Sequence, residues 1–351
     1  MDTDALSPEA VDRVDASGQL SDILDLPEHL RDALWRVDSA NLQGWDSPAG
    51  LVVAGMGGSA IGGDLARVCL GDQASRPILA ARGYGLPSWT TPETTVLCAS
   101  YSGNTEETLA AYEAAGFLGA RRVVVTTGGK LAEAARGDDV PVIPVPGGFQ
   151  PRAAVGYMTV AALEVAALCG AGPRMASDID VAAAHLDALC GEWGPDTPAD
   201  NEAKQLAHAL HGSVPQITGS GLTAPVAYRW KTQINENAKI PAFSHELPEV
   251  DHNEIVGWQG AAGLGRFSAV FLDDADNHPR IGDRIDFTSE LIAGSAHTVQ
   301  RVATRGRGTV ERVMSLVLLG DLVSLYLAVL QGLDPTPVDV IESLKGRLAE
   351  R

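Results

Sequence analysis

The chain has 351 residues, of which 45% are hydrophobic and 20% charged, and this composition is typical of a globular protein with room for two domains. Its 45 acidic and 26 basic residues give a formal net charge of −19, which argues against nucleic acid or an anionic membrane as a partner. An anionic ligand would therefore depend on local donors and not on the overall field of the protein.

The amino-terminal segment, residues 1 to about 48, is predicted to be helical and shows no signal-peptide pattern. The apolar stretch 313–330 is interrupted by Gly320, Asp321 and Ser324, so no membrane span is expected. The four cysteines stand in apolar surroundings without metal-ligand spacing and are expected to be reduced core residues. These features predict a cytoplasmic protein.

Strands and helices alternate from residue 49 onward. Short β-branched runs predict strands at 51–54, 77–81, 95–99, 122–127 and 140–145, with helical patterns after the first, third and fourth. An alanine-rich helix over 153–168 closes this half. The alternation predicts an α/β fold with a doubly wound parallel sheet flanked by helices.

A Gly/Pro turn at 170–173 is the best candidate for a domain boundary. We therefore predict a first unit, 1–170, with the amino-terminal helices and one α/β domain, and a second α/β domain over 171–351 that ends in a helix. In the second unit two helices precede strands at 216–221, 268–272 and 297–302. Helices are expected at 222–239, 280–292, 309–331 and 337–349, and 244–251 is expected to be a loop.

Two turns of small residues follow buried strands in the first half. Gly57, Gly58 and Ser59 come after the first strand, and the segment 100–105 comes after the third. Glycine lets the backbone approach a ligand, and the first N–H groups of the following helix favour an anion. Neutral hydroxyl donors are available from Ser59, Ser100, Ser102 and Thr105. Together the turns predict a phosphate-sized anion site without a metal.

Other glycine-rich sites explain these turns less well. The P-loop requires Gly-Lys-Ser/Thr, whereas Lys130 is followed by Leu131. A Rossmann NAD site expects an acid after the second strand, where this chain has Arg82. Arg82 leaves an NADP site open as an alternative, and a plain tight connection between strand and helix remains the structural explanation for either turn alone.

The second half contains residues suited to proton transfer. Glu236 lies between two asparagines, and His252 lies in a polar segment just before an apolar run. A carboxylate and an imidazole are common general acids and bases near neutral pH. From spacing alone, an acid in a polar helix turn such as Glu236 is more often a surface charge, and a lone histidine such as His252 is by default one that serves only structure.

Five motifs, taken together, resemble one known family. They are Gly57-Gly58-Ser59, the segment 100–108, Asn235-Glu236-Asn237, the segment 252–258 and Asp334-Pro335-Thr336-Pro337. Their order and sequence closely resemble the bifunctional phosphoglucose/phosphomannose isomerases, which belong to the sugar isomerase (SIS) domain superfamily. The resemblance runs from about residue 49 to the carboxyl terminus.

This resemblance implies two SIS domains, a homodimer, and an active site between the domains that the partner subunit completes. In the family pattern Ser59, Ser100, Ser102 and Thr105, with Gly57 and Gly58, match the phosphate-binding turns. Arg152 matches an arginine near the reacting carbons and Glu236 the base. His252 matches the ring-opening histidine, contributed across the interface, and Lys345 a lysine of the last helix.

The activity that the resemblance implies is an aldose–ketose isomerisation through a cis-enediol. It would interconvert fructose 6-phosphate with mannose 6-phosphate, glucose 6-phosphate or both, and would use neither metal nor cofactor. The alternative is a regulator that binds sugar phosphates through SIS domains without catalysis. Such a regulator would not require Glu236 and His252, so their joint presence favours the enzyme.

Overall fold

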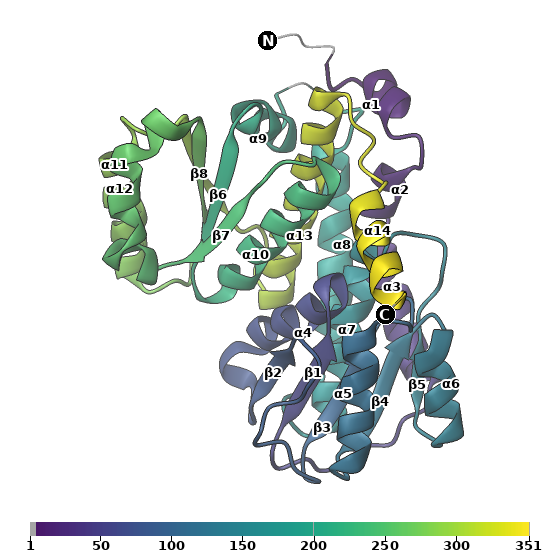
Figure 1. Cartoon of the computed structure of the whole chain (residues 1–351). Coiled ribbons are helices and arrows are strands. Elements are labelled where there is room, and N and C mark those ends of the chain that lie inside the picture. The colour runs from purple at the N-terminus through teal and green to yellow at the C-terminus, as the bar shows by residue number, and fades with distance from the viewer. Residues whose placement is uncertain (1–4, 199, 351) are drawn as a thin grey trace.

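The computed structural model describes residues 5–198 and 200–350 and contains two parallel β-sheets with helices packed around and between them (Figure 1). Three helices precede the first strand: α1 (Pro8–Val14), α2 (Gln19–Leu24) and α3 (Leu26–Ser39). Most apolar residues of α3, among them Leu30 and Leu34, are buried, whereas Trp35 is exposed. The helical prediction is confirmed within residues 8–39, whereas 40–48 form no helix and residues 1–4 lie outside the described residues.

The first sheet has the strand order β2-β1-β3-β4-β5, with every neighbouring pair parallel. The strands are β1 (Leu51–Gly55), β2 (Ile78–Ala81), β3 (Thr95–Ala99), β4 (Arg121–Thr126) and β5 (Val142–Pro144). Helices α4 (Gly57–Leu70), α5 (Glu106–Phe117) and α6 (Gly129–Gly137) follow β1, β3 and β4. In such a sheet the strand order reverses between β1 and β3, and ligands bind beyond the carboxyl ends of the strands at that point.

The second sheet repeats this pattern with the order β7-β6-β8-β9. Its strands are β6 (Val214–Gly219), β7 (Phe243–Glu246), β8 (Phe267–Asp273) and β9 (Thr298–Ala303), again all parallel. Its helices are α10 (Ala224–Asn237), α11 (Glu254–Leu264) and α12 (Pro279–Ile292). The predicted fold class, two α/β units with parallel sheets flanked by helices, is confirmed.

Two elements of the second half differ from the sequence prediction. Strand β7 lies where we expected a loop, and α11 was not predicted. The strand has only four residues, none of them buried, and pairs with β6 alone at the sheet edge. A short edge strand lacks the apolar pattern that identifies a buried one, because it has few neighbours to pack against.

The helix α13 (Thr309–Gln331) runs through the middle of the molecule, between the two sheets (Figure 1). It is the one helix of the described residues that is long and apolar enough to cross a membrane, and 94% of its apolar window is buried inside the protein. It contacts α8 (Ala176–Trp193), α9 (Glu202–Leu210), α10 and α4. This packing is that of a core helix, and the cytoplasmic location stays a prediction.

Helix α10 crosses α13 at very close range. A Cβ atom on Gly320 of α13 would lie 2.2 Å from the indole nitrogen of Trp230 on α10, and that nitrogen donates to the Leu316 carbonyl at 2.7 Å. One hydrophobic cluster includes residues of both halves, such as Met158 of α7 (Val155–Leu168) and Trp230. Both sheets thus rest on a shared core, and the division at 170/171 stays a prediction.

Candidate active site

The two small-residue turns lie side by side at the carboxyl ends of β1 and β3. Parallel pairing places Gly55 opposite Ala99, and the Tyr101 backbone N–H donates to the Ser59 hydroxyl at 3.2 Å. Ser59 is buried in the first turn of α4. The turns that the sequence pointed to are therefore one structural unit at the place where the strand order reverses.

The second turn is organised by its own hydroxyl groups. The hydroxyls of Ser100 and Thr105 lie 2.8 Å apart, and the Gly103 N–H donates to Ser100 at 3.1 Å. Ser102 is exposed and accepts from the Asn104 N–H at 3.2 Å. Four of the predicted phosphate-binding side chains thus occupy two adjoining turns, each at the start of a helix.

Arg152 lies directly behind the first turn. A Cβ atom on Gly58 would be 3.0 Å from the Pro151 carbonyl oxygen and 3.2 Å from the Cα of Arg152. The residue belongs to the 3₁₀ turn η2 (Pro151–Ala154), and 3% of its surface is exposed. The glycine therefore allows the phosphate-site backbone to pack against the backbone that carries the arginine.

The guanidinium group of Arg152 is held on three sides. Its Nε donates to Asn237 Oδ1 at 2.7 Å, and its Nη2 donates to the carbonyls of Pro335 at 2.8 Å and Thr336 at 3.0 Å. Its Nη1 donates to Gln150 at 3.3 Å and lies 3.7 Å from Glu236 Oε2. Burial lowers the pKa of Arg152, and the nearby Glu236 carboxylate opposes that shift.

Glu236 occupies the last turn of α10, and its side chain is 31% exposed. It lines a cavity of about 590 Å³ whose opposite wall is the segment 337–341. A volume of this size lies in the range of small-molecule pockets, roughly 300–1,000 Å³. Asn235 and Glu236 of the Asn-Glu-Asn motif and Pro337 of the Asp-Pro-Thr-Pro motif thus line one cavity, and Arg152 connects the two motifs by its hydrogen bonds.

Lys239 also belongs to this site, although no sequence pattern assigned it a role. Its Nζ donates to the Glu236 carbonyl at 2.6 Å and to the Pro335 carbonyl at 2.9 Å. Burial lowers its pKa, with a further contribution from the charge of Arg152. The available signal was its position three residues after Glu236, just beyond the end of the same helix.

Lys345 lies on α14 (Asp339–Ala349), whose first turn lines the cavity. The lysine is six residues beyond Asp339, which is roughly 9 Å along a helix axis. Its side chain is exposed. The structure therefore places Lys345 on the last helix, and no hydrogen bond or ion pair within the described residues links its side chain to Glu236.

His252 lies apart from the other predicted residues. It is exposed in the 3₁₀ turn η4 (Glu249–His252), just before α11. Figure 1 shows α11 and α12 at the outer end of the second sheet, away from α14. No hydrogen bond or ion pair within the described part of the chain links His252 to Arg152 or Glu236.

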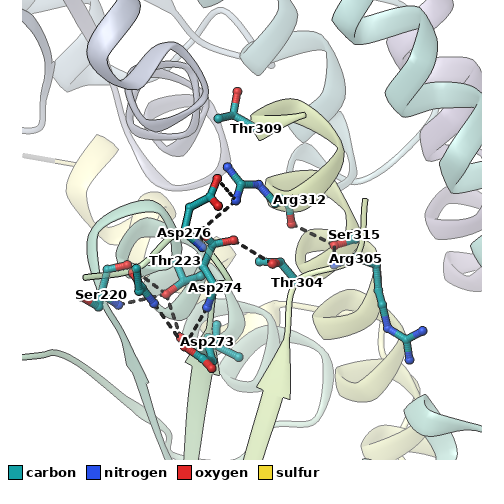
Figure 2. Close-up of polar contacts among 12 residues, drawn as sticks. Ser220, Thr223, Asp273, Asp274, Asp276, Thr304, Arg305, Thr309, Arg312 and Ser315 are labelled. Carbon is teal, nitrogen blue, oxygen red and sulfur yellow. Dashed lines mark hydrogen bonds and ion pairs between the residues drawn. The ribbon is translucent and has the colours of Figure 1, made fainter. Parts of the chain in front are cut away.

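The corresponding crevice of the second sheet is filled by the protein's own side chains (Figure 2). Arg312 of α13 donates to Asp274 at 3.1 Å and to Asp276 at 2.6 Å, and Thr304 donates to Asp274 at 2.7 Å. Arg312 and Asp274 are both buried. The second sheet thus repeats the strand arrangement of the first, but these side chains occupy the space at the carboxyl ends of its strands.

Among residues 5–198 and 200–350, no group of three His, Cys, Asp or Glu side chains is arranged to hold a metal ion. Arg82, which left an NADP site open, forms an ion pair with Asp64 and stacks on Tyr228, with 5.4 Å between its guanidinium carbon and the ring centre.

Comparison with known proteins decides the family. The model of the bacterial phospho-glucose isomerase C-terminal SIS domain matches residues 199–348. The bifunctional phosphoglucose/phosphomannose isomerase of Caldicellulosiruptor bescii is 41% identical over 333 residues, covering 93% of this chain and 98% of that protein. The chain belongs to the bifunctional phosphoglucose/phosphomannose isomerase family. It is therefore a sugar-phosphate isomerase, as the five motifs indicated.

Two further comparisons agree with this membership. The family member from Aquifex aeolicus is 35% identical, with 85% of this isomerase and 90% of that protein covered. Among solved structures, a glucose-6-phosphate isomerase-like protein from Thermus thermophilus superposes with a TM-score of 0.63 at 21% identity, covering 97% and 98% of the two chains. That structural likeness supports the fold.

Proposed function

We propose that this isomerase interconverts fructose 6-phosphate with mannose 6-phosphate, glucose 6-phosphate or both, by proton transfer between C2 and C1. The observation that carries the proposal is the ion pair of Arg152 and Glu236, whose nearest atoms lie 3.7 Å apart, with Glu236 lining a cavity of about 590 Å³. The same arginine packs its backbone against Gly58 of the phosphate turn. The turn proposed to bind phosphate and the Arg152–Glu236 ion pair are thus linked through Arg152.

The phosphate is assigned to the two adjoining turns. Ser59, Ser100, Ser102 and Thr105 offer hydroxyl donors, and the amino ends of α4 and α5 add backbone N–H groups and the positive end of the helix dipole. Neutral donors hold a phosphate monoester without the strong ion pair that a lysine or arginine would add. This favours a ligand that must leave after each turnover.

Glu236 is assigned the role of the base. Its carboxylate takes the C2 proton of the open-chain aldose while water supplies a proton to the C1 oxygen, which gives the cis-enediol. The carboxylate then returns its proton to C1 as the C2 hydroxyl gives its proton to water, which gives the ketose. The Nη1 edge of Arg152, which faces Glu236, stabilises negative charge on the two oxygens.

Ring opening requires a proton to move between O5 and O1, and we assign it to His252 with help from Lys345. Because His252 is exposed and lies away from Glu236 in one chain, the proposal places His252 of the partner subunit in the site. The apolar residues of α14 support a contact with a second chain, since Ile341, Leu344 and Leu348 are between 40% and 58% exposed and recur at helical spacing. The functional unit is accordingly a homodimer.

Coupled spectrophotometric assays of the purified protein on both aldose phosphates test the proposal. We expect formation of fructose 6-phosphate from at least one of them, at a rate unchanged by a chelator. A protein that binds the sugar phosphates but turns over neither would be the regulator that the sequence left as the alternative. A rate that fell with chelator would instead show a metal requirement.

A further inference from the structure

A row of buried polar side chains lies between α10 and α13 and ends at Arg152. Asn237, the last residue of α10, is fully buried, and its Oδ1 accepts from the Arg152 Nε at 2.7 Å. Its Nδ2 donates to the hydroxyl of Ser324 on α13 at 2.9 Å. Ser324 is also fully buried, so the amide of Asn237 bridges the arginine and the central helix.

The direction of these hydrogen bonds is fixed by Ser324. Its hydroxyl has one hydrogen, which it donates to the Asp321 carbonyl at 2.7 Å. The Ser324 oxygen can therefore only accept from Asn237, so the NH₂ end of the amide must face the serine. The oxygen end then faces Arg152, whose Nε–H needs an acceptor.

A second contact holds the backbone of the same arginine. Arg229, about two turns before Asn237 on α10, donates from its Nη2 to the Arg152 carbonyl at 3.0 Å and pairs with the Asp321 carboxylate at 2.5 Å. Asp321 thus accepts from Ser324 through its carbonyl and from Arg229 through its side chain. The backbone and the side chain of Arg152 are both anchored to one turn of α13.

We infer that Ser324 is a positioning residue for the isomerisation: it orients the Asn237 amide, which in turn aims the Nη1 edge of Arg152 at Glu236. This inference rests on the proposed function, since it requires Arg152 to act on the reacting oxygens. Ser324 is not among the residues that line the cavity, so its effect passes through Asn237. A merely structural serine would affect stability without affecting turnover.

Helix α13 provides a matched control in Ser315. This serine is also fully buried, and it donates to the carbonyl three residues earlier, Arg312, at 2.8 Å. It accepts from the Arg305 backbone N–H at 2.9 Å, in the second sheet's filled crevice (Figure 2). Ser315→Ala and Ser324→Ala therefore remove the same kind of group from the same helix.

The test compares kcat and KM for these two variants, with thermal melts to show that both are folded. We expect Ser324→Ala to lower kcat by about 3- to 10-fold, the range for one hydrogen bond, with KM unchanged, because Arg152 acts in the transition state. Ser315→Ala should leave kcat within about 2-fold of wild type. Equal effects of the two variants on kcat would overturn the inference.

A double-mutant cycle with Asn237→Ala tests whether Ser324 acts on Arg152 through Asn237. If Ser324 acts through Asn237, Ser324→Ala should change kcat by less than about 2-fold once the amide is gone. Effects that multiply would show that the serine acts independently and would overturn the inference.

Arg152→Ala separates this inference from the proposed function. A wild-type kcat in Arg152→Ala would remove the role of the arginine and overturn this inference, while the measured turnover would leave the isomerase activity in place; only a protein that turned over neither aldose phosphate would overturn the proposed function. A large loss in Arg152→Ala beside a wild-type Ser324→Ala would overturn the inference alone.

Discussion

Arg152 and Glu236 approach each other from different halves of the chain, and their nearest nitrogen and oxygen atoms lie 3.7 Å apart. This distance is within the range of electrostatic attraction but longer than a hydrogen bond, which spans roughly 2.7–3.2 Å for N–H···O. The carboxylate is thus paired with the arginine by charge and accepts no hydrogen bond from it.

The first prediction concerns Glu236→Gln. The amide has the shape of the carboxylate but cannot take up a proton, so we expect kcat to fall by about 10²- to 10⁴-fold while sugar-phosphate binding persists. Exchange of the C2 proton with deuterated solvent, followed by NMR, measures the step directly. Glu133→Gln on the exposed face of α6 is the control and should exchange normally. Normal exchange in Glu236→Gln would exclude this residue as the base.

The second prediction concerns Gly58→Ala. The new Cβ would meet two backbone atoms, at 3.0 and 3.2 Å, so the η2 segment must shift by a few tenths of an ångström and carry Arg152 with it. We expect kcat to fall by about 10-fold, because misplacement by 1 Å can cost about 10²-fold.

The matched control for this glycine is Gly191→Ala in α8, where nothing lies within 4 Å of the new Cβ. It should stabilise the protein by about 0.5–1 kcal/mol through helix propensity and leave kcat unchanged. Denaturant titrations together with steady-state rates check both variants. A Gly58→Ala enzyme as fast as Gly191→Ala would show that the segment tolerates the shift.

The third prediction tests whether His252 acts across a dimer. Glu236→Gln and His252→Ala should each be nearly inactive as homodimers. After mixing with subunit exchange, half of the dimers are mixed and each holds one intact site, which gives about a quarter of wild-type activity. Activity that does not reappear, with exchange verified by mass spectrometry, would place Glu236 and His252 of one site on the same chain.

The fourth prediction is a pH dependence of stability that arises from His29. This histidine of α3 is buried against Phe149 and Tyr157, with ring centres 5.1 and 5.2 Å away, and burial lowers its pKa although nearby acidic residues oppose the shift. The unfolded chain therefore binds a proton at a higher pH than the folded protein. The stability that this neutral imidazole contributes is present above the unfolded pKa of about 6.5 and is lost as the pH falls through the folded value.

His29→Phe keeps an aromatic ring but cannot titrate. We expect its free energy of unfolding, from urea titrations at pH 7.5 and pH 5, to fall less on acidification than that of wild type. His211→Phe, at an exposed position, should retain the wild-type pH dependence. If His29→Phe and wild type lost equal stability between the two pH values, His29 would not be the titrating group.

The fifth prediction concerns the cysteines. Burial raises the pKa of both Cys69 and Cys98 to about 12, and also raises the pKa of Cys169 and Cys190. Because the thiolate is the reactive form, we expect the native protein to react slowly with a thiol reagent and the denatured protein to titrate four thiols. Rapid labelling of native Cys98, located by peptide mapping, would contradict its burial in β3.

The sequence was most informative where strand, turn and helix follow each other directly. β1 and β3 are short buried runs ending at small residues, so both the sheet and the adjoining turns followed from local patterns. Glu236 and Arg152 are 84 residues apart, and only the packing of α10 on the first half brings them together. No local pattern encodes such a contact, so the family motifs had to supply it.

Other parts of the site depend on the tertiary structure alone. Lys239 holds the Glu236 and Pro335 carbonyls because it follows the end of α10 with a left-handed backbone, φ 57°. Asn237 was visible as a neighbour of Glu236, but its burial and its bond to Arg152 were not. Side chains whose role is to orient others have no sequence signature of their own, since their partners lie on distant elements.

The position of α13 has a consequence for how the chain acquires its structure during synthesis. This helix comes close to the end of the sequence yet lies between elements made much earlier, among them α4 and α8. Until residue 331 has left the ribosome, the parts of those helices that pack on α13 stay uncovered, although α4 can already pack on α7 and α8 on α3. Folding intermediates of the nascent chain should therefore expose the surfaces that α13 later buries, and these surfaces are candidate sites for chaperone binding until α13 has been made.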